Sequence, residues 1–238
     1  YCKVISTILV SATPIFFSLI AIFMERVVIL FLLNKANNDE TVIAATGLGS
    51  AWLTLISISL FLSLNVGLTT RTSQAYGAKQ FETIGLLFHR ALIINGILLI
   101  PCIGLLMYAE SAFSVFDFEP RLANLTSKYL IACVPGVVMF VVFATIASVL
   151  NGCERFKIPG AIQVIAAFSY WIAAYIFIIV FKLGIVGVAL GFNIMWAIAL
   201  AIVIMYLRKK NPLPTVFFWP KKESYKGIWT LFKYEMII

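Results

Sequence analysis

Two charged residues stand side by side inside a long apolar stretch near the start of the chain. Glu25 and Arg26 lie within the run 4–33, with apolar residues on both sides. A charge at the centre of a membrane helix costs roughly 2.5–3.5 kcal/mol on insertion scales, so such residues normally face a bundle interior or a water-filled cavity. The position of Glu25 therefore predicts a proton or cation site. The pKa of its carboxyl group would be tuned by Arg26 or by another helix. The alternative is a structural polar contact between helices, and neighbours about 100° apart on a helix need not pair with each other.

Three amides and one tyrosine extend the set of candidates. Asn65, Asn95 and Asn193 each lie inside an apolar run, where they could line a solute path or hydrogen-bond to another helix. Interhelical hydrogen bonds in lipid contribute only about 0.6 kcal/mol on average, and we favour the structural role for each amide. Tyr170 could stack on a planar cation, although such aromatic residues more often pack or sit at the membrane interface.

The chain carries no pattern typical of catalysis. No His, Cys or acidic cluster has metal-ligand spacing, and no phosphate-binding loop is present. The four cysteines form no CxxC pair, and two of them, Cys102 and Cys133, lie in apolar runs as small hydrophobic residues would. We therefore expect no enzyme, no metal site and no resident cofactor.

Long apolar helices must position these residues. The chain is 62% hydrophobic and 12% charged, with a mean hydropathy of +1.03, far from the composition of soluble domains. The apolar residues fall in runs long enough to cross a bilayer, and the alternating pattern of a β-barrel is absent. Backbone groups in lipid must be satisfied internally, so the runs predict helices. They cover residues 4–33, 42–68, 86–108, 125–150 (interrupted by Pro135 and Gly136), 161–181 and 185–207. The fold class is thus an all-α membrane protein with a six-helix transmembrane bundle.

Charge predicts the orientation of this bundle. The net charge of +8 does not indicate a nucleic-acid partner, because the basic residues lie between the apolar runs. Most of them fall on the side that holds the N-terminus, and the positive-inside rule makes that side cytoplasmic. Asn124 begins an Asn-Leu-Thr glycosylation sequon on the opposite side, although it lies close to the membrane.

The domain organisation is one lobe with the beginning of another. Residues 1–207 form the predicted six-helix lobe, 208–227 a basic cytoplasmic linker, and 228–238 the opening of a seventh span. The polar stretch after Leu207 is too short for a soluble domain. We expect the sequence to be a piece of a longer polypeptide.

Three motifs lie near the ends of predicted helices. Residues 67–78, GLTTRTSQAYGA, follow the second helix and include Gln74, Ala75, Tyr76, Gly77 and Ala78. Residues 149–159, ending in Pro159, join the fourth and fifth helices, and residues 183–190, with Gly184 and Gly187, open the sixth. In order and spacing these motifs resemble those of one family, the multidrug and toxic compound extrusion (MATE) transporters, although Asn151 stands where glutamine is usual in that family. We interpret these residues as structural: Gly77 can end its helix in a left-handed conformation, and the other glycines allow helices to approach closely.

The resemblance implies a function. Members have two six-helix lobes around a central cavity, and they export organic, often cationic, solutes against a proton or sodium gradient by alternating access. The partners implied are a small organic solute, the lipid bilayer and a second six-helix lobe. Plasma membrane and an endomembrane such as that of the vacuole both fit the charge pattern.

This sequence departs from the family pattern at the cation site. Many prokaryotic members carry an aspartate where Ile29 stands, and an asparagine is usual where Ser169 and Tyr170 stand. Coupling then lies in the second lobe, or Glu25 substitutes, or coupling is lost. A structural subunit that transports nothing is one alternative. A lipid-linked oligosaccharide flippase of the same superfamily is another, disfavoured because Arg26 is the one interior cation where such a cavity tends to be strongly basic.

Overall fold

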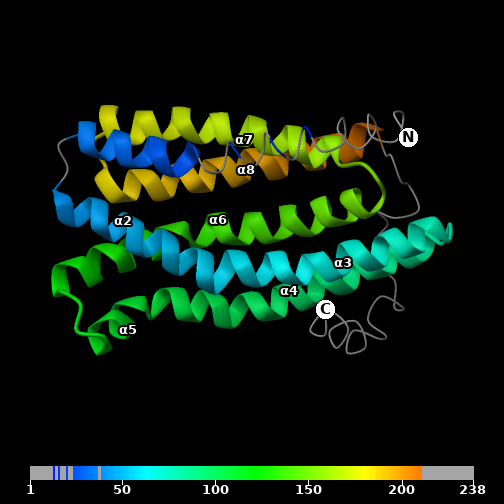
Figure 1. The fold of residues 1–238 in the computed structure, drawn as a ribbon, viewed down its shortest axis with the longest axis horizontal. Helices are drawn as coiled ribbons and strands as arrows, with labels where there is room; N and C mark the ends of the chain where they lie inside the picture. The colour runs from blue at the N-terminus through cyan, green and yellow to red at the C-terminus, as the bar shows by residue number, and fades with distance from the viewer. Residues whose placement is uncertain (1–12, 14–15, 17–19, 21–23, 37–38, 211–238) are drawn as a thin grey trace.

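The computed structural model describes Thr13, Phe16, Ile20 and the stretches 24–36 and 39–210. These residues form helices and turns, with no strand among them. Residues 24–35 are helical and belong to the first predicted span. The elements that follow are α2 (Glu40–Leu53), η1 (Thr54–Ile58), α3 (Ser59–Gly77), α4 (Phe81–Met107), α5 (Ala109–Val115), α6 (Pro120–Gly152), α7 (Lys157–Tyr175), η2 (Ile176–Val180) and α8 (Gly184–Lys210) (Figure 1).

Five helical stretches in the described part are long and apolar enough to cross a bilayer. The longest, Glu40–Gly77, joins α2, the π-helical segment η1 and α3 without a break. Together they confirm the second to the sixth predicted span, whereas most of the first lies outside the described residues. Helix α8 continues to Lys210, three residues past the predicted end of the lobe at residue 207. The rest of the predicted linker and the seventh span, 211–238, also lie outside the described residues.

Non-glycine residues in the left-handed conformation end three of the helices. Lys79, Asp117 and Glu154 have φ values of 58°, 56° and 60°. At each site the next backbone N–H bonds a carbonyl five residues earlier, as in a Schellman motif: Gln80 to Ala75 at 2.9 Å, Phe118 to Phe113 at 3.2 Å, and Arg155 to Leu150 at 2.9 Å.

The expectation that Gly77 takes a left-handed conformation is therefore wrong. Gly77 is the last helical residue of α3, and the left-handed position falls two residues later, at Lys79. The helix extends nine residues, about two and a half turns, beyond the apolar run that ends at residue 68. By contrast, the predicted tight turn before helix six is confirmed: Lys182 and Gly184 have φ values of 53° and 54°.

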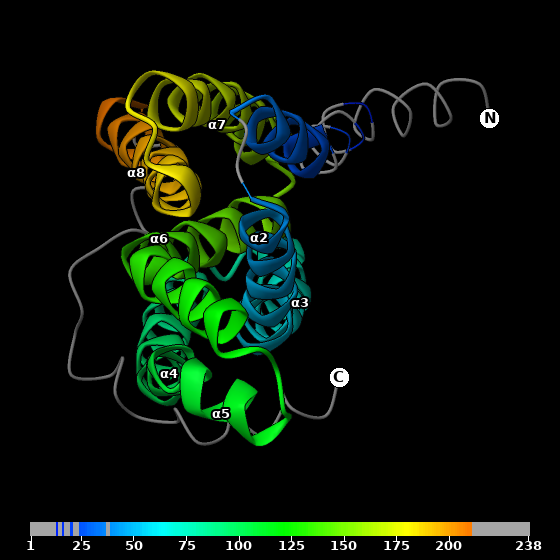
Figure 2. The same cartoon turned by 90° about the vertical axis from the view of Figure 1, so that its left-hand side faces the viewer.

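Helix α6 is the centre of the bundle. It packs against α8 on one side and against α2, α3, α4 and α5 on the other, and it is the most buried of the five spans. Figure 2 shows α6 between the α7–α8 hairpin and the group formed by α2, α3 and α4. Any residue that joins α6 to α8 therefore holds the two halves of the lobe together.

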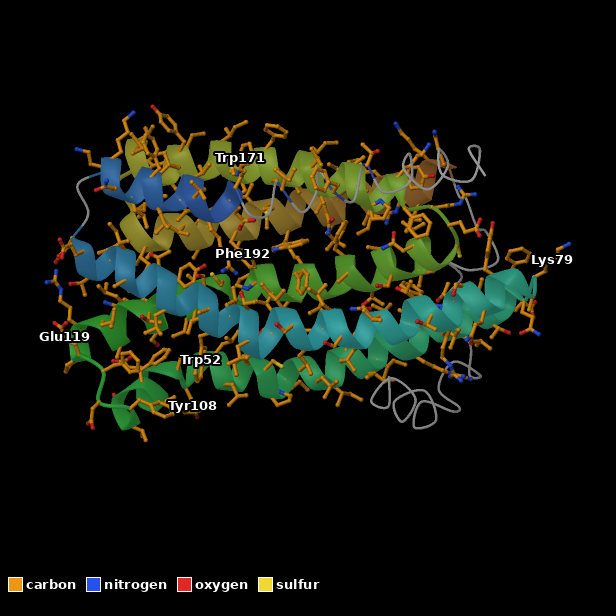
Figure 3. All side chains as sticks on the ribbon, viewed as in Figure 1. Trp52, Lys79, Tyr108, Glu119, Trp171 and Phe192 are labelled. Atoms are coloured by element: carbon orange, nitrogen blue, oxygen red, sulfur yellow. The ribbon has the colours of Figure 1, made fainter. Side chains whose placement is uncertain are left out.

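The ends of the bundle are marked by polar contacts and aromatic packing. Arg121 at the start of α6 forms an ion pair with Asp39, which precedes α2, at 2.7 Å. Phe113 of α5 packs between Trp52 and Phe118, with ring centroids 5.0 and 5.6 Å away. Lys79 and Glu119 lie at opposite ends of the bundle (Figure 3), as the predicted topology requires.

Candidate functional site

Glu25 and Arg26 follow one another in sequence but turn toward different parts of the molecule. The Arg26 side chain is exposed and donates a hydrogen bond from Nη2 to Oγ1 of Thr54, at 3.2 Å. Glu25 is half-buried and forms no ion pair within the described part of the chain. Because consecutive helical residues point about 100° apart, one carries its charge to the exposed face while the other directs it inward.

Two buried tyrosines lie within electrostatic reach of the Glu25 carboxyl group. Tyr129 of α6 and Tyr170 of α7 lie close enough to Glu25 for its charge to act on their hydroxyl groups, and their side chains are buried. The Cys133 thiol lies one turn further along α6 than Tyr129 and acts on the same hydroxyl group. We call Glu25, Tyr129 and Tyr170, which come from three helical segments, the Glu25 cluster.

Tyr170 has a role in packing as well. Its ring is only 3% exposed and lies against Gly191 of α8, where an added Cβ would come 3.1 Å from Cε2. The ring therefore offers no open face on which a planar solute could stack in this arrangement. Sequence reasoning selected Tyr170 and missed Tyr129, whose only sequence signal is a phenol inside an apolar run.

Thr54 anchors the outward charge. It begins η1, and π-helical turns inside α-helices are frequent at functional sites. Its hydroxyl donates to the Ser50 carbonyl at 2.7 Å and accepts from Arg26. The bond to Ser50 orients Oγ1, and the bond from Arg26 holds the guanidinium beside this helix. No sequence pattern pointed to this residue.

Asn193 is a structural residue of the α6–α8 contact. Its Oδ1 accepts a hydrogen bond from the Gly136 N–H at 2.8 Å, and its Nδ2 donates to the Ala132 carbonyl at 2.8 Å. Phe192, the preceding residue, also lies against Gly136 and is directed from α8 toward α6 (Figure 3). Both polar atoms of the side-chain amide are therefore used in the contact between α8 and α6.

The other two amides are buried between α3, α4 and α6. Asn95 donates from Nδ2 to Oγ1 of Thr145 at 2.8 Å, an interhelical hydrogen bond of the predicted kind. Asn65 donates to the carbonyl of Phe61 at 2.7 Å, within its own helix, while its Oδ1 is buried and accepts no hydrogen bond. Neither amide lies on an exposed face of the lobe.

The surface of the lobe differs from one side to the other. Beyond their first turns, α4 and α7 expose apolar and aromatic residues, for example Ile165, Phe168 and Ile172 of α7. The exposed stripe of η1 and α3 is mixed: hydroxyl and amide side chains lie among the apolar Leu55, Leu62 and Val66, and Arg26 lies beside it. The polar side chains are Ser59, Ser63, Thr70, Ser73 and Gln74. We call this the polar face. Apolar stripes suit lipid, whereas a charged residue at membrane depth suits a water-filled path.

The residues of the three motifs have structural surroundings. Tyr76 stacks edge-on with Phe81 across the α3–α4 turn, with ring centroids 6.0 Å apart, Ala75 is buried, and Gln74 and Ala78 are exposed. Pro159 lies in the first turn of α7, where a missing N–H removes no helix hydrogen bond. Gly187 lies where α8 meets the end of the α7 span, and an added Cβ would come 3.1 Å from the Phe177 backbone.

Asn124 already has a hydrogen-bond partner. It lies in the first turns of α6, and its Nδ2 donates to Oε1 of Glu110 at 3.0 Å. Thr126 of the same sequon is buried and donates to the Leu122 carbonyl at 2.8 Å. A glycan on Asn124 would have to displace the contact with Glu110.

The described cysteines are buried free thiols. Cys102 and Cys133 lie within spans, and Cys153 lies just after α6. Burial raises the pKa of the Cys153 thiol to about 11, although the charge of Arg155 acts in the opposite direction. A thiol that stays protonated at neutral pH is a poor nucleophile and a poor metal ligand.

Comparison with known proteins gives one consistent result. The MatE family model matches residues 14–176. Protein DETOXIFICATION 51 of Arabidopsis thaliana is 23% identical over 218 residues, which are 91% of this chain and 40% of that protein. Multidrug and toxin extrusion protein 1 of Oryctolagus cuniculus is 24% identical over 206 residues, 85% of this chain and 36% of that protein.

Solved structures share the fold. The crystal structure of the eukaryotic MATE transporter AtDTX14 superposes with a TM-score of 0.85 at 15% identity, covering 94% of this chain and 50% of that one. A multidrug resistance MATE family transporter of the MOP superfamily, in an outward-facing conformation, gives 0.79 at 18% identity, with 94% and 51% coverage. The chain thus spans about half the length of these structures, and less of the curated relatives.

Proposed function

The chain belongs to the MatE family, as the motifs predicted, and we propose that it is the first six-helix lobe of a secondary transporter that exports small organic solutes. The lobe spans about half of the solved structures that it resembles. The proposal therefore concerns the whole transporter, in which residues 208–227 link this lobe to a second one. A site between two repeats needs both of them, and alternating access moves one against the other.

One observation carries the proposal: the lobe has a polar face and apolar faces within the same membrane. Arg26 and the hydroxyl groups of the polar face lie along η1 and α3, while α4 and α7 expose apolar stripes. In a six-helix unit that faced lipid on every side, the exposed Arg26 would be strongly disfavoured. A water-filled path between two lobes removes that cost.

The serine and threonine hydroxyl groups of this face are compatible with such a path. Ser63 and Thr70 donate to the carbonyls of Ser59 and Val66, at 2.8 and 3.1 Å. Their donors are therefore satisfied inside the helix, while their lone pairs stay available to water or solute. A face of this kind can border a moving solute without holding it tightly.

We assign ion coupling to the Glu25 cluster. A carboxylate at this depth binds a proton or a sodium ion, and the Tyr129 and Tyr170 hydroxyl groups supply oxygen atoms beside it. Occupation of the cluster changes the charge between residues 24–35, α6 and α7, and a difference in ion affinity between two conformations drives transport. Glu25 then substitutes for the aspartate that many prokaryotic members carry where Ile29 stands.

The solute and the membrane follow from the family and not from the geometry. By resemblance the solutes are organic and cationic, and the driving ion is H⁺ or Na⁺. The export direction runs from the cytoplasmic side, where the basic residues are concentrated, to the opposite side. The host membrane is the plasma membrane or an endomembrane.

The test is transport by the full-length protein in proteoliposomes. We expect uptake of tetraethylammonium or of an organic anion, driven by an imposed proton or sodium gradient and abolished when both gradients are collapsed. A variant with Glu40→Gln, an exposed change at the start of α2, should transport as the wild type does. If no organic ion of either charge moves under either gradient, the proposal that the protein exports organic solutes is wrong. The alternative hypothesis, a structural subunit that transports nothing, is then favoured.

A further inference from the structure

The charge on the polar face is positive. Arg26 supplies a guanidinium group there, and its side chain is exposed. Glu25, its neighbour, is half-buried, acts electrostatically on the buried Tyr129 and Tyr170, and forms no ion pair within the described residues. A solute that passes this face therefore meets the guanidinium and not the carboxyl group.

The guanidinium lies at membrane depth. Its partner Thr54 lies 12 residues after Val42 and 14 before Leu68, so it is about 18 and 21 Å along the helix from the two ends of that apolar run. The apolar core of a bilayer is about 30 Å thick, and Thr54 therefore lies near its middle. At this depth we expect the counter-charge of Arg26 to come from within the transporter or from the solute.

Most of the hydrogen-bond donors of Arg26 have no acceptor within the described part of the chain. A guanidinium has five N–H donors in a flat fork, and within the described part of the chain only Thr54 accepts from it. Thr54 is a neutral partner that positions the group without cancelling its charge. The fork fits the two oxygen atoms of a carboxylate, sulfate or phosphate group, and such pairs are short and directional.

We propose that the exported solute carries an acidic group and that Arg26, held by Thr54, binds its oxygen atoms. The inference rests on the proposed function and narrows its substrate class. It departs from the cationic solutes that the family resemblance implies, because an organic cation would be repelled by the one charge that the described part of this face carries at membrane depth. The Glu25 cluster stays available for the driving ion, separated from the solute.

The experiment compares two probes in proteoliposomes of the full-length protein: p-aminohippurate, an organic carboxylate, and tetraethylammonium. We expect the wild type to take up p-aminohippurate faster. Arg26→Gln should lower that uptake at least tenfold and leave tetraethylammonium uptake equal or higher. Arg26→Lys should keep part of the activity, because the charge stays and the fork is lost. Thr54→Val should raise the KM for p-aminohippurate with little change in kcat.

Controls separate the possible results. Lys157→Gln removes one positive charge at the exposed start of α7 and should leave both uptake rates unchanged. A thermal shift of wild type, but not of Arg26→Gln, on addition of p-aminohippurate would show binding directly, provided that both variants melt at similar temperatures without it. If Arg26→Gln lowers the uptake of both probes equally, the inference is overturned. The result would favour an ion pair between Arg26 and a carboxylate of the second lobe. Wild-type uptake of tetraethylammonium alone would also overturn it, while leaving the proposed export function intact. Movement of neither probe would contradict the export function itself.

Discussion

The side-chain amide of Asn193 on α8 hydrogen-bonds two backbone groups of α6, beside Gly136. In an unbroken helix the Gly136 N–H would bond the Ala132 carbonyl, four residues earlier. Instead the Gly136 N–H donates to Asn193 Oδ1, and Asn193 Nδ2 donates to the Ala132 carbonyl, each at 2.8 Å. Pro135, which has no N–H and crowds the preceding turn, explains why the helix needs a substitute here. Gly136 leaves room for it, since an added Cβ would lie 2.6 Å from Asn193 Oδ1.

Removal of this amide should destabilise the whole lobe. Asn193→Ala leaves two backbone groups of α6 unpaired in a membrane, where no water replaces the lost partner. We expect a loss of about 1–3 kcal/mol, given that single interhelical hydrogen bonds contribute about 0.6 and at most about 1.7 kcal/mol. Thermal melting of the full-length protein in detergent measures it. Asn95→Ala, which breaks one side-chain hydrogen bond to Thr145, is the comparison and should cost less. An equal or larger loss for Asn95→Ala would contradict the assigned role of Asn193.

Two glycines should respond in opposite ways to alanine. An added Cβ at Gly152 would lie 2.6 Å from the Thr72 Cβ and 2.9 Å from the Thr69 carbonyl oxygen, so Gly152→Ala forces α6 away from α3. Overpacking of this kind costs about 1–3 kcal/mol. Gly77 is helical, with nothing within 4 Å of the added atom. Gly77→Ala should be neutral or stabilise by up to about 1 kcal/mol. Melting curves that rank the two variants the other way would show that the signature glycine is needed for its backbone after all.

Glu25→Gln should uncouple transport without unfolding the protein. The amide keeps the shape of the side chain and cannot gain or lose the proton. We expect solute exchange across the membrane to continue, while accumulation driven by a proton or sodium gradient falls to the level without a gradient. Counterflow and gradient-driven uptake in the same proteoliposomes distinguish the two activities. If the variant still accumulates solute like the wild type, coupling lies in the second lobe and Glu25 is a structural residue.

Periodicity and charge predict most of the helices because they are local properties. Each of the five spans in the described part follows from a run of apolar residues, and the polar interruptions correctly mark the turns near residues 79, 154 and 182. The position of the left-handed residue was missed, because Gly77 looks like a helix end while the backbone turns at Lys79. The apolar run does not mark the end of this helix, because the residues that follow the run are polar and still helical.

The surroundings of the polar residues could not be predicted in the same way. Asn193 and Pro135 are each visible as exceptions within an apolar run, but nothing in the sequence indicates that Asn193 hydrogen-bonds the backbone groups beside Pro135. Likewise, Glu25 and Arg26 stand out as a pair, whereas their separate partners, Tyr129 and Thr54, lie on helices far along the chain. Such contacts depend on which helices become neighbours and how each is rotated, and a single sequence does not contain that information.

The measurement that tests the account most directly is water access to the polar face. In the full-length protein, with its native cysteines replaced by alanine, Ser63→Cys on α3 is compared with Ile172→Cys on the apolar stripe of α7. Both side chains are exposed on the lobe, so a difference in reaction rate reports what covers them. We predict that a membrane-impermeant methanethiosulfonate reagent modifies Ser63→Cys at least tenfold faster, because thiols ionise in water and not in lipid. Equally slow modification of both positions would mean that α3 faces lipid or packed protein, and the proposed solute path would be contradicted.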